Sequence, residues 1–171
     1  LDEKTCQTAT VYGYGRVLKD RLPTPAWKEE VWKDGIANID EHLNGVKNHN
    51  TFISDEYTFP YSKHAEAINT VQKWFVEETR LGIPVDFTNE GIHGLTHDKA
   101  TPLPAPIAIG STWNKKLVYQ AGEIVGREAK ALGYTNVYTP ILDVSRDPRW
   151  GRVGETYGED PFLIAELGIN M

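Results

Sequence analysis

The sequence predicts an α/β fold with a largely parallel sheet. Helical and strand patterns alternate along its 171 residues, in the order helix, helix, strand, strand, helix, strand, helix. Strands separated by helices need crossover connections, and such connections lead to parallel pairing. The length is ample for one hydrophobic core and short for two. A doubly wound sheet and a barrel both agree with this order, and periodicity does not choose between them.

Two amphipathic helices are predicted in the first half of the chain. Thr24-Pro25 combines an N-cap residue with a proline in the first turn, and Asn44-Gly45 would stop the helix that begins there. The apolar residues of this helix recur at steps of three and four and are Trp32, Ile36, Ile39 and Leu43. A second helix ends near Gly82. Its inward face comprises Ala65, Ile68, Val71 and Phe75.

Three apolar runs further along are predicted to form buried strands. They are residues 83–88, residues 106–109 and residues 136–144, the second of which contains prolines. Because the strands are predicted to be parallel, their carboxyl ends are expected at one edge of the sheet.

Two more helices complete the prediction. One runs from about Asn114 to Leu132, and the other begins at Asp160-Pro161, where an acid at the N-cap precedes a proline. The first of these helices is expected to turn Leu117, Ala121, Ile124 and Val125 inward. Gly122 and Gly126, four residues apart, would let a neighbouring element approach it closely.

Composition narrows the class of function. The net charge is −6 and the pI is near 5.4, whereas a surface for duplex nucleic acid would need clustered Lys and Arg. No apolar run approaches the roughly 20 residues that cross a bilayer. Cys6 is the only cysteine, so neither an internal disulfide nor a thiolate metal cluster is expected. Leu1 and Met171 both look like cut ends, which predicts a piece of a longer polypeptide.

Polar side chains follow two of the predicted strands. The first strand leads into Asn89 and Glu90, and the last leads into the charged stretch that starts at Ser145 and Arg146. An ionised Glu90 can accept hydrogen bonds from two neighbouring hydroxyls, and Arg146 can donate to others through its rigid fork. Trp150 adds an apolar face. This mixture suits a neutral polyol such as a sugar, and the glycine loop with a lysine that binds phosphate is missing.

Other charged residues near Arg146 have a structural interpretation. Asp147, Arg149, Arg152 and Glu155 are expected to form ion pairs that rigidify a long loop. For Trp150, core packing and a sugar-binding platform both stay open.

The two histidines of the first loop do not predict a metal site. His93 and His97 have the i, i+4 spacing of zinc ligands on a helix, but Gly91 and Gly94 favour a loop and the glutamate of the metalloprotease motif is missing. We expect no metal and no cofactor, and we expect His93 to hold its loop through hydrogen bonds.

Several motifs resemble one known family. Residues 146–152 read Arg-Asp-Pro-Arg-Trp-Gly-Arg and residues 155–161 read Glu-Thr-Tyr-Gly-Glu-Asp-Pro, which together are similar to the hallmark stretch of family 3 glycoside hydrolases. Asn-Glu-Gly-Ile-His-Gly at 89–94 resembles the substrate-binding loop of that family. Residues 1–4, 108–114 and 126–128 also resemble family segments in the right order, so the resemblance covers the whole chain.

The resemblance implies an exo-acting β-glycosidase that works with retention. Family members begin with a TIM-like barrel, so residues 1–171 would be a partial N-terminal glycoside hydrolase barrel domain, the first part of a (β/α)8 barrel. The aspartate nucleophile, the glutamate acid/base and a Lys-His pair that binds substrate come later in the family, beyond Met171. No catalytic residue is therefore expected in this chain, which should be inactive alone. Its partners would be an oligosaccharide or β-glycoside and the rest of the same polypeptide.

Two residues carry over by motif position as sugar-binding candidates: Glu90 and Arg146 would hold the hydroxyls of the terminal sugar. His93 and Gly94 carry over as the frame of the loop. With His93, Trp150 completes the set of substrate-binding candidates, through its apolar face. Many family members, glucosidases especially, have aspartate where this chain has Glu90. The longer side chain leaves less room for a C6 hydroxymethyl group, so the resemblance allows either glucosyl or xylosyl substrates.

Two alternatives to an enzyme piece stay open at this point. Half a barrel could serve as a non-catalytic carbohydrate-binding module, or as an interaction module that docks with its other half. The sequence leaves the compartment open, and a secreted or periplasmic location of the whole protein is compatible with it.

Overall fold

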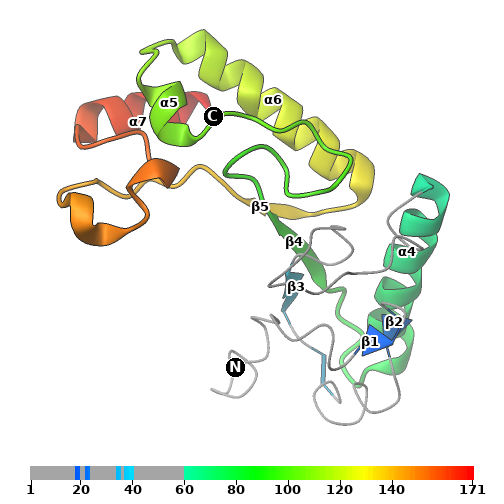
Figure 1. Ribbon diagram of the computed structural model, residues 1–171. Coiled ribbons are helices and arrows are strands. Elements are labelled where there is room, and N and C mark those ends of the chain that lie inside the picture. The colour runs from blue at the N-terminus through cyan, green and yellow to red at the C-terminus, as the bar shows by residue number, and fades with distance from the viewer. Residues whose placement is uncertain (1–17, 20–21, 24–33, 36, 41–59) are drawn as a thin grey trace. The chain divides into compact units, whose positions relative to one another are not determined.

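The computed structural model describes residues 18–19, 22–23, 34–35, 37–40 and 60–171 (Figure 1). The described strands and helices, in chain order, are β1 (Leu18–Lys19), β2 (Leu22–Pro23), β3 (Asn38–Asp40), α4 (Tyr61–Glu78), β4 (Asp86–Glu90), α5 (Pro106–Gly110), α6 (Lys115–Leu132), β5 (Asn136–Tyr138), the 3-10 turns η2 (Pro148–Trp150) and η3 (Val153–Glu155), and α7 (Pro161–Asn170). None of the described helices is long and apolar enough to cross a membrane.

The chain divides into two compact units. Unit 1 comprises Leu1–Asn89 and Leu132–Asn136, and unit 2 comprises Glu90–Ala131 and Val137–Met171. Both Glu90 and Arg146 therefore belong to unit 2.

Helix α4 supplies much of the described core of unit 1. Its buried residues are His64, Ala67, Ile68, Val71, Trp74 and Phe75. The helix predicted here is confirmed, with two differences: Ala65 is exposed, and the helix ends at Glu78, before Gly82. Gln72 joins α4 to the segment that enters β4, because its side-chain amide donates to the carbonyl of Val85 and accepts from the N–H of the same residue, both at 2.9 Å.

The sheet that contains β4 has the strand order β3-β4-β5. Strands β3 and β4 pair in parallel with Ile39 opposite Phe87, and both of these side chains are buried. The expected parallel pairing is confirmed for these two strands. A separate antiparallel pair, β1 and β2, was not predicted by the sequence.

The helix predicted across Ile39 is wrong at that residue. Ile39 lies in β3, where the ladder to β4 uses its backbone hydrogen bonds, and Gly35 at φ +85° interrupts a helical path just before it. The expected helix start at Thr24-Pro25 and the positions of Trp32, Ile36 and Leu43 lie outside the described residues.

Two of the predicted strands have different bounds. Strand β4 begins three residues later than the apolar run at Ile83, which is exposed, and it extends through Glu90. Strand β5 ends at Tyr138, far short of residue 144. The N–H of Thr139 turns back to the carbonyl of Val137 at 3.0 Å, and Pro140 has no N–H to continue a ladder.

The strand predicted at residues 106–109 is wrong, because α5 occupies this segment. Pro106 lies in the first helical turn, a position that suits proline. The N–H of Ile109 donates to the carbonyl of Ala105 at 3.1 Å and that of Ser111 donates to Ile107 at 3.0 Å. A four-residue apolar run such as 106–109 is compatible with either a strand or a helix, so the run alone could not decide between them.

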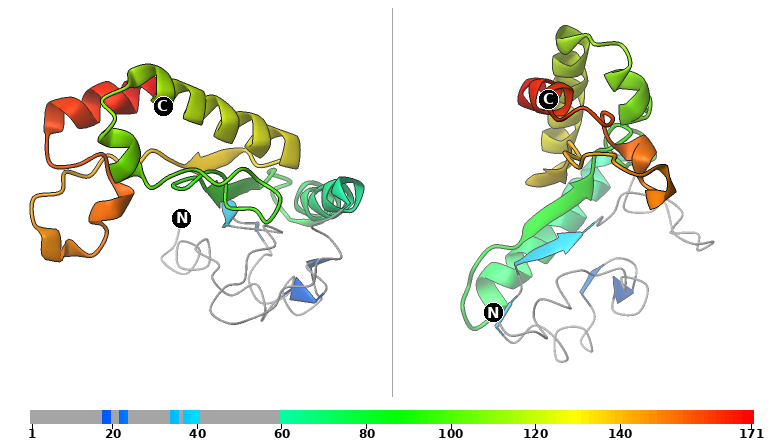
Figure 2. Two further views of the ribbon diagram at one scale, coloured as in Figure 1. Left: turned by 45° about the horizontal axis from the view of Figure 1, so that its top comes forward. Right: turned by 90° about the vertical axis from the view of Figure 1, so that its left-hand side faces the viewer.

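Helices α6 and α7 lie beside each other in unit 2 (Figure 2). A Cβ atom on Gly122 would come within 2.3 Å of the carbonyl oxygen of Met171, so the expected close approach at Gly122 is confirmed, whereas the same position on Gly126 meets nothing within 4 Å. Leu117, expected inward, is exposed. The core cluster of this unit consists of Ile109, Val118, Tyr157, Ile164 and Leu167.

Candidate saccharide-binding site

The loop after β4 begins at Glu90, the last residue of the strand. The Glu90 side chain is half-buried, with Oε2 shielded from solvent, and its backbone carbonyl accepts a hydrogen bond from the N–H of Thr96 at 2.8 Å. Gly91 follows, where a Cβ atom would lie 2.5 Å from Cγ1 of Val137 and 2.9 Å from Cγ2 of Thr139. The backbone next to Glu90 therefore contacts the residues of β5 and its turn, at a distance that only glycine permits.

The far side of the same loop is fixed by a second segment, residues 101–103. Gly94 has φ +88°, and a Cβ atom there would lie 2.2 Å from the carbonyl oxygen of Thr101. The backbone carbonyl of His93 accepts from the N–H of Leu103 at 2.7 Å. His93 thus holds the loop through its backbone, while its imidazole is exposed and makes no hydrogen bond with the described residues.

The segment that carries Arg146 is a loop whose two ends lie in contact with each other. The hydroxyls of Ser145 and Thr156 lie 2.8 Å apart in a buried hydrogen bond, and the N–H of Ser145 donates to the carbonyl of Gly158 at 3.0 Å. These contacts close the base of residues 146–155. The segment also packs closely on α5, because a Cβ on Gly110 would lie 2.7 Å from the carbonyl oxygen of Tyr157.

Within this segment the expected ion pairs are confirmed. Asp147 caps η2 by accepting the N–H of Arg149 at 2.9 Å, and it accepts Nε of the same arginine at 2.9 Å. Hydrogen bonding from the Arg149 side chain lowers the pKa of Asp147, and the pKa of Arg149 is raised in return. Arg152 donates from Nε to Glu155 at 2.7 Å. The charges form two separate pairs along the loop.

Arg152 also links the two candidate loops electrostatically. Its pKa is raised first by the hydrogen bond and the charge of Glu155, and further by the charges of Glu90 and Asp143. The charges of Arg152 and Glu90 therefore interact, although the two residues lie on different loops of unit 2. Elsewhere in the segment, burial raises the pKa of the Tyr157 phenol.

Arg146 and Trp150 are both available at the surface. Arg146 is exposed and makes no side-chain hydrogen bond or ion pair with the described part of the chain. Trp150 is 39% exposed, so core packing does not account for it. The guanidinium fork and the indole face can therefore both meet a ligand.

Metal binding finds no support in the described residues. They contain no group of three or more His, Cys, Asp or Glu side chains arranged to hold a metal ion. Of the two histidines spaced i, i+4, His93 is exposed and His97 is buried. The Nδ1 atom of His97 accepts the N–H of Lys99 at 3.1 Å and lies 3.3 Å from Asp98.

Sequence reasoning missed one residue that shapes the first loop. The carboxylate of Glu128, on α6, accepts hydrogen bonds from both the backbone N–H and the hydroxyl of Thr101. No local signal could reveal this contact, because 27 residues separate the partners.

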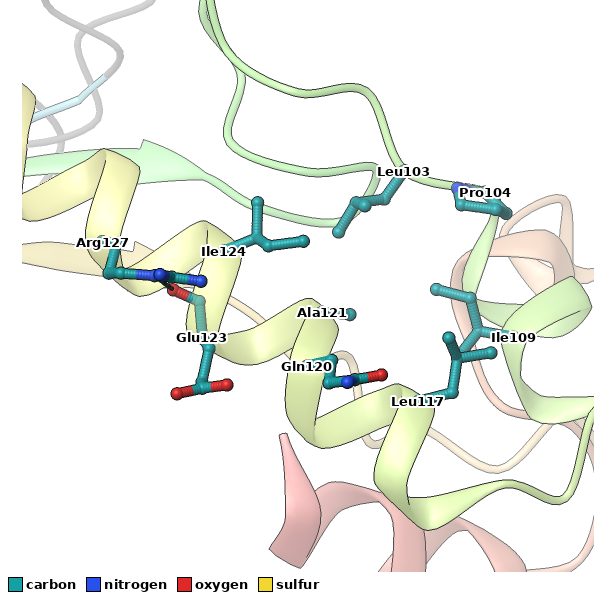
Figure 3. A pocket seen from close by; sticks show the side chains of 9 residues that line it. All are labelled: Leu103, Pro104, Ile109, Leu117, Gln120, Ala121, Glu123, Ile124 and Arg127. Atoms are coloured by element: carbon teal, nitrogen blue, oxygen red, sulfur yellow. Dashed lines mark hydrogen bonds between the residues drawn. The ribbon is translucent and has the colours of Figure 1, made fainter.

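A pocket in unit 2 is lined by none of the four candidate residues (Figure 3). Its volume is about 380 Å³. Glu123 and Arg127 on α6 supply its charged groups. The other lining residues are Leu103, Pro104, Ile109, Leu117, Gln120, Ala121 and Ile124. Its mainly apolar lining does not suit a sugar in the way the two polar loops do.

Comparison with known proteins gives consistent matches. The family model for the glycosyl hydrolase family 3 N terminal domain matches residues 29–171. A β-xylosidase of Formosa agariphila is 43% identical over 53% of the chain, and a periplasmic β-glucosidase of Salmonella typhimurium is 35% identical over 61%. The chain spans 13% of the length of each of these relatives.

Solved structures agree with the sequence matches. A β-glucosidase from Listeria innocua in complex with isofagomine aligns with the whole chain at a TM-score of 0.64 and 30% identity, with 20% of that protein covered. A β-glucosidase from Erythrobacter marinus aligns with 80% of the chain at a TM-score of 0.66 and 29% identity, with 16% of that protein covered.

Proposed function

Because the chain belongs to glycosyl hydrolase family 3, we propose that it supplies sugar-binding residues to a retaining, exo-acting β-glycosidase. The substrates would be oligosaccharides or β-glycosides that end in a β-D-glucosyl or β-D-xylosyl residue. Residues 1–171 would form part of a single N-terminal barrel domain. We call the longest natural polypeptide that contains this chain the full-length protein.

The observation that carries the proposal is the setting of Glu90. Its side chain is half-buried at the carboxyl end of β4, the edge at which ligands bind in parallel sheets, and its charge interacts with that of Arg152. A carboxylate can accept hydrogen bonds from two adjacent sugar hydroxyls through its two oxygens. Arg146, whose side chain is exposed on the other loop of the same unit, would donate to the remaining hydroxyls.

Each of the other two candidates has a distinct role in this proposal. His93 would donate or accept one hydrogen bond through its exposed imidazole, and Trp150 would offer its indole as an apolar platform for the sugar ring. None of the four residues would attack the anomeric carbon or protonate the leaving group. Those steps, which need two carboxyl groups on either side of the scissile bond, would fall to residues of the full-length protein outside this chain.

Glu90 would also tune the choice between glucose and xylose. Relative to an aspartate at this position, its extra methylene would reduce the room next to C5 of the sugar, where glucose has a hydroxymethyl group and xylose has hydrogen. One methylene in a binding pocket changes discrimination by about tenfold or more. The similarity to proteins named β-xylosidase and β-glucosidase agrees with both sugars as candidates.

Turnover of two chromogenic substrates tests the proposal. The full-length protein should hydrolyse 4-nitrophenyl β-D-xyloside with a higher kcat/KM than the corresponding glucoside. Glu90→Asp should raise the glucoside-to-xyloside ratio of kcat/KM by about tenfold. Glu159→Asp makes the same change on an exposed residue and should leave the ratio unaltered. A strong preference of the natural protein for glucoside would overturn the steric argument, and no hydrolysis of either substrate would overturn the function.

A further inference from the structure

Glu128 makes an unusual set of contacts for a residue in the middle of a helix. Its Oε1 accepts the hydroxyl of Thr101 at 2.6 Å and the N–H of Thr101 at 3.2 Å, while Oε2 accepts the same N–H at 3.1 Å. Within the described residues no Lys or Arg pairs with this carboxylate. Both of its oxygens are therefore directed at one residue of a loop, in charge-assisted bonds that exceed neutral ones in strength.

Thr101 transmits this restraint to the loop that carries His93. Its carbonyl oxygen lies where a side chain on Gly94 would have to be, at 2.2 Å from the ideal Cβ position. Two residues later, the N–H of Leu103 donates to the carbonyl of His93 at 2.7 Å. Residues 101–103 thus pack against His93 and Gly94. The hydrogen bonds of Glu128 hold Thr101, the first of these residues, to α6.

The other end of the loop is held by different contacts. Gly91 packs on Val137 and Thr139, and the carbonyl of Glu90 accepts the N–H of Thr96. None of these contacts involves Glu128. Loss of the Glu128 carboxylate should therefore release the His93 end of the loop while the Glu90 end stays in place.

We propose that Glu128 is a positioning residue of the sugar site, which sets the place of His93 relative to Glu90 by clamping Thr101 to α6. This inference rests on the proposed function of the loop. Glu128 itself does not touch the sugar. Since the clamp determines how the loop meets the bound sugar, and the reacting groups lie elsewhere, its loss should act on KM more than on kcat.

Kinetics of full-length variants test the clamp. Glu128→Ala should raise KM for the preferred nitrophenyl glycoside by about tenfold with kcat changed by less than about twofold, the size expected when a charge-assisted hydrogen bond no longer orders a binding loop. Thr101→Val, which keeps the N–H and the shape but loses the hydroxyl, should show a smaller rise. Thr101→Ser keeps the hydroxyl and should therefore keep the natural KM.

A matched control separates positioning from stability. Lys115→Met removes the ion pair between Lys115 and Glu166, which also involves α6 but does not touch Thr101. It should lower Tm without changing KM. As a readout that does not depend on turnover, exchange of the Leu103 amide hydrogen should be faster in Glu128→Ala and unchanged in Lys115→Met.

The possible outcomes distinguish a failure of the proposed role of Glu128 from a failure of the proposed glycosidase function. A natural KM in Glu128→Ala, in a full-length protein that hydrolyses the substrate normally, would overturn the role of Glu128 and leave the function intact. An equal rise of KM in Lys115→Met would also overturn it, because the effect would then follow stability alone. If the natural protein hydrolysed neither glycoside, the proposed function would fall and the positioning role would fall with it.

Discussion

Gly91 and Gly94 shape the Glu90 loop for different reasons. Gly91 has no room for a side chain because β5 and its turn lie against it, whereas Gly94 combines a lack of room with a φ of +88°. A residue with a Cβ atom at Gly94 would have to displace backbone at Thr101, which cannot yield as a flexible side chain does. The sequence indicated a loop from these two glycines, and the structure gives the contacts that require them.

Substitution of two glycines by alanine should have opposite effects on stability. Gly94→Ala should lower the free energy of unfolding by about 3 kcal/mol, from backbone strain at positive φ together with the clash on Thr101. Gly126→Ala, on α6 with open space around it, should raise that free energy by about 0.5–1 kcal/mol through helix propensity. Urea denaturation of the two variants gives both values, and a Gly94→Ala protein as stable as the natural one would contradict the loop geometry.

The sequence predicted those parts of the candidate site that lie at the end of a strand or whose interacting residues are close together along the chain. Glu90 comes at the end of a strand, and the expected ion pairs involve residues only two or three positions apart, so that spacing was sufficient to find them. Glu128 was not predictable, since its partner comes from a loop 27 residues earlier. The interaction between the charges of Glu90 and Arg152 was not predictable for the same reason, because the two residues are far apart in the sequence.

Two helix starts, at Asn114 and at Asp160, were predicted accurately from the sequence. Asp160 accepts the N–H groups of Phe162 at 2.8 Å and Leu163 at 3.2 Å, and Asn114 accepts the N–H of Leu117 at 3.1 Å. Such caps depend on residues two or three positions away, so the local sequence determines them. Strand ends depend instead on partners far along the chain, which explains why 136–144 was predicted too long and Ile39 was assigned to a helix.

The cap of α7 can be tested directly. Asp160→Ala should lower the free energy of unfolding by about 1 kcal/mol, because two N–H groups at the start of the helix lose their acceptor. Glu159→Ala, one residue earlier and exposed, should change it by less than about 0.5 kcal/mol. Chemical denaturation measures both, and equal effects would mean that the cap does not support α7.

As a whole, the chain has the α/β fold of the N-terminal barrel domain of its family. The sequence could not choose between a barrel and a doubly wound sheet by periodicity, because both place helices between parallel strands. The resemblance of the motifs from Arg146 to Asp160 to family 3 glycoside hydrolases indicated the barrel, and the family match over residues 29–171 confirms it. The structure adds how unit 2 holds its two loops, through Gly91 and Gly94 on one and through Ser145, Thr156 and Gly158 on the other.

The proposed sugar site requires that Glu90 and Arg146 bind the same sugar. The most direct test measures kcat/KM of the full-length protein for its preferred nitrophenyl glycoside, in the natural form and in Glu90→Ala, Arg146→Ala and Glu159→Ala. Each of the first two variants should lose about 100-fold or more, since each leaves sugar hydroxyls without a charged partner. Glu159→Ala should match the natural protein. Natural activity in either Glu90→Ala or Arg146→Ala would contradict the claim.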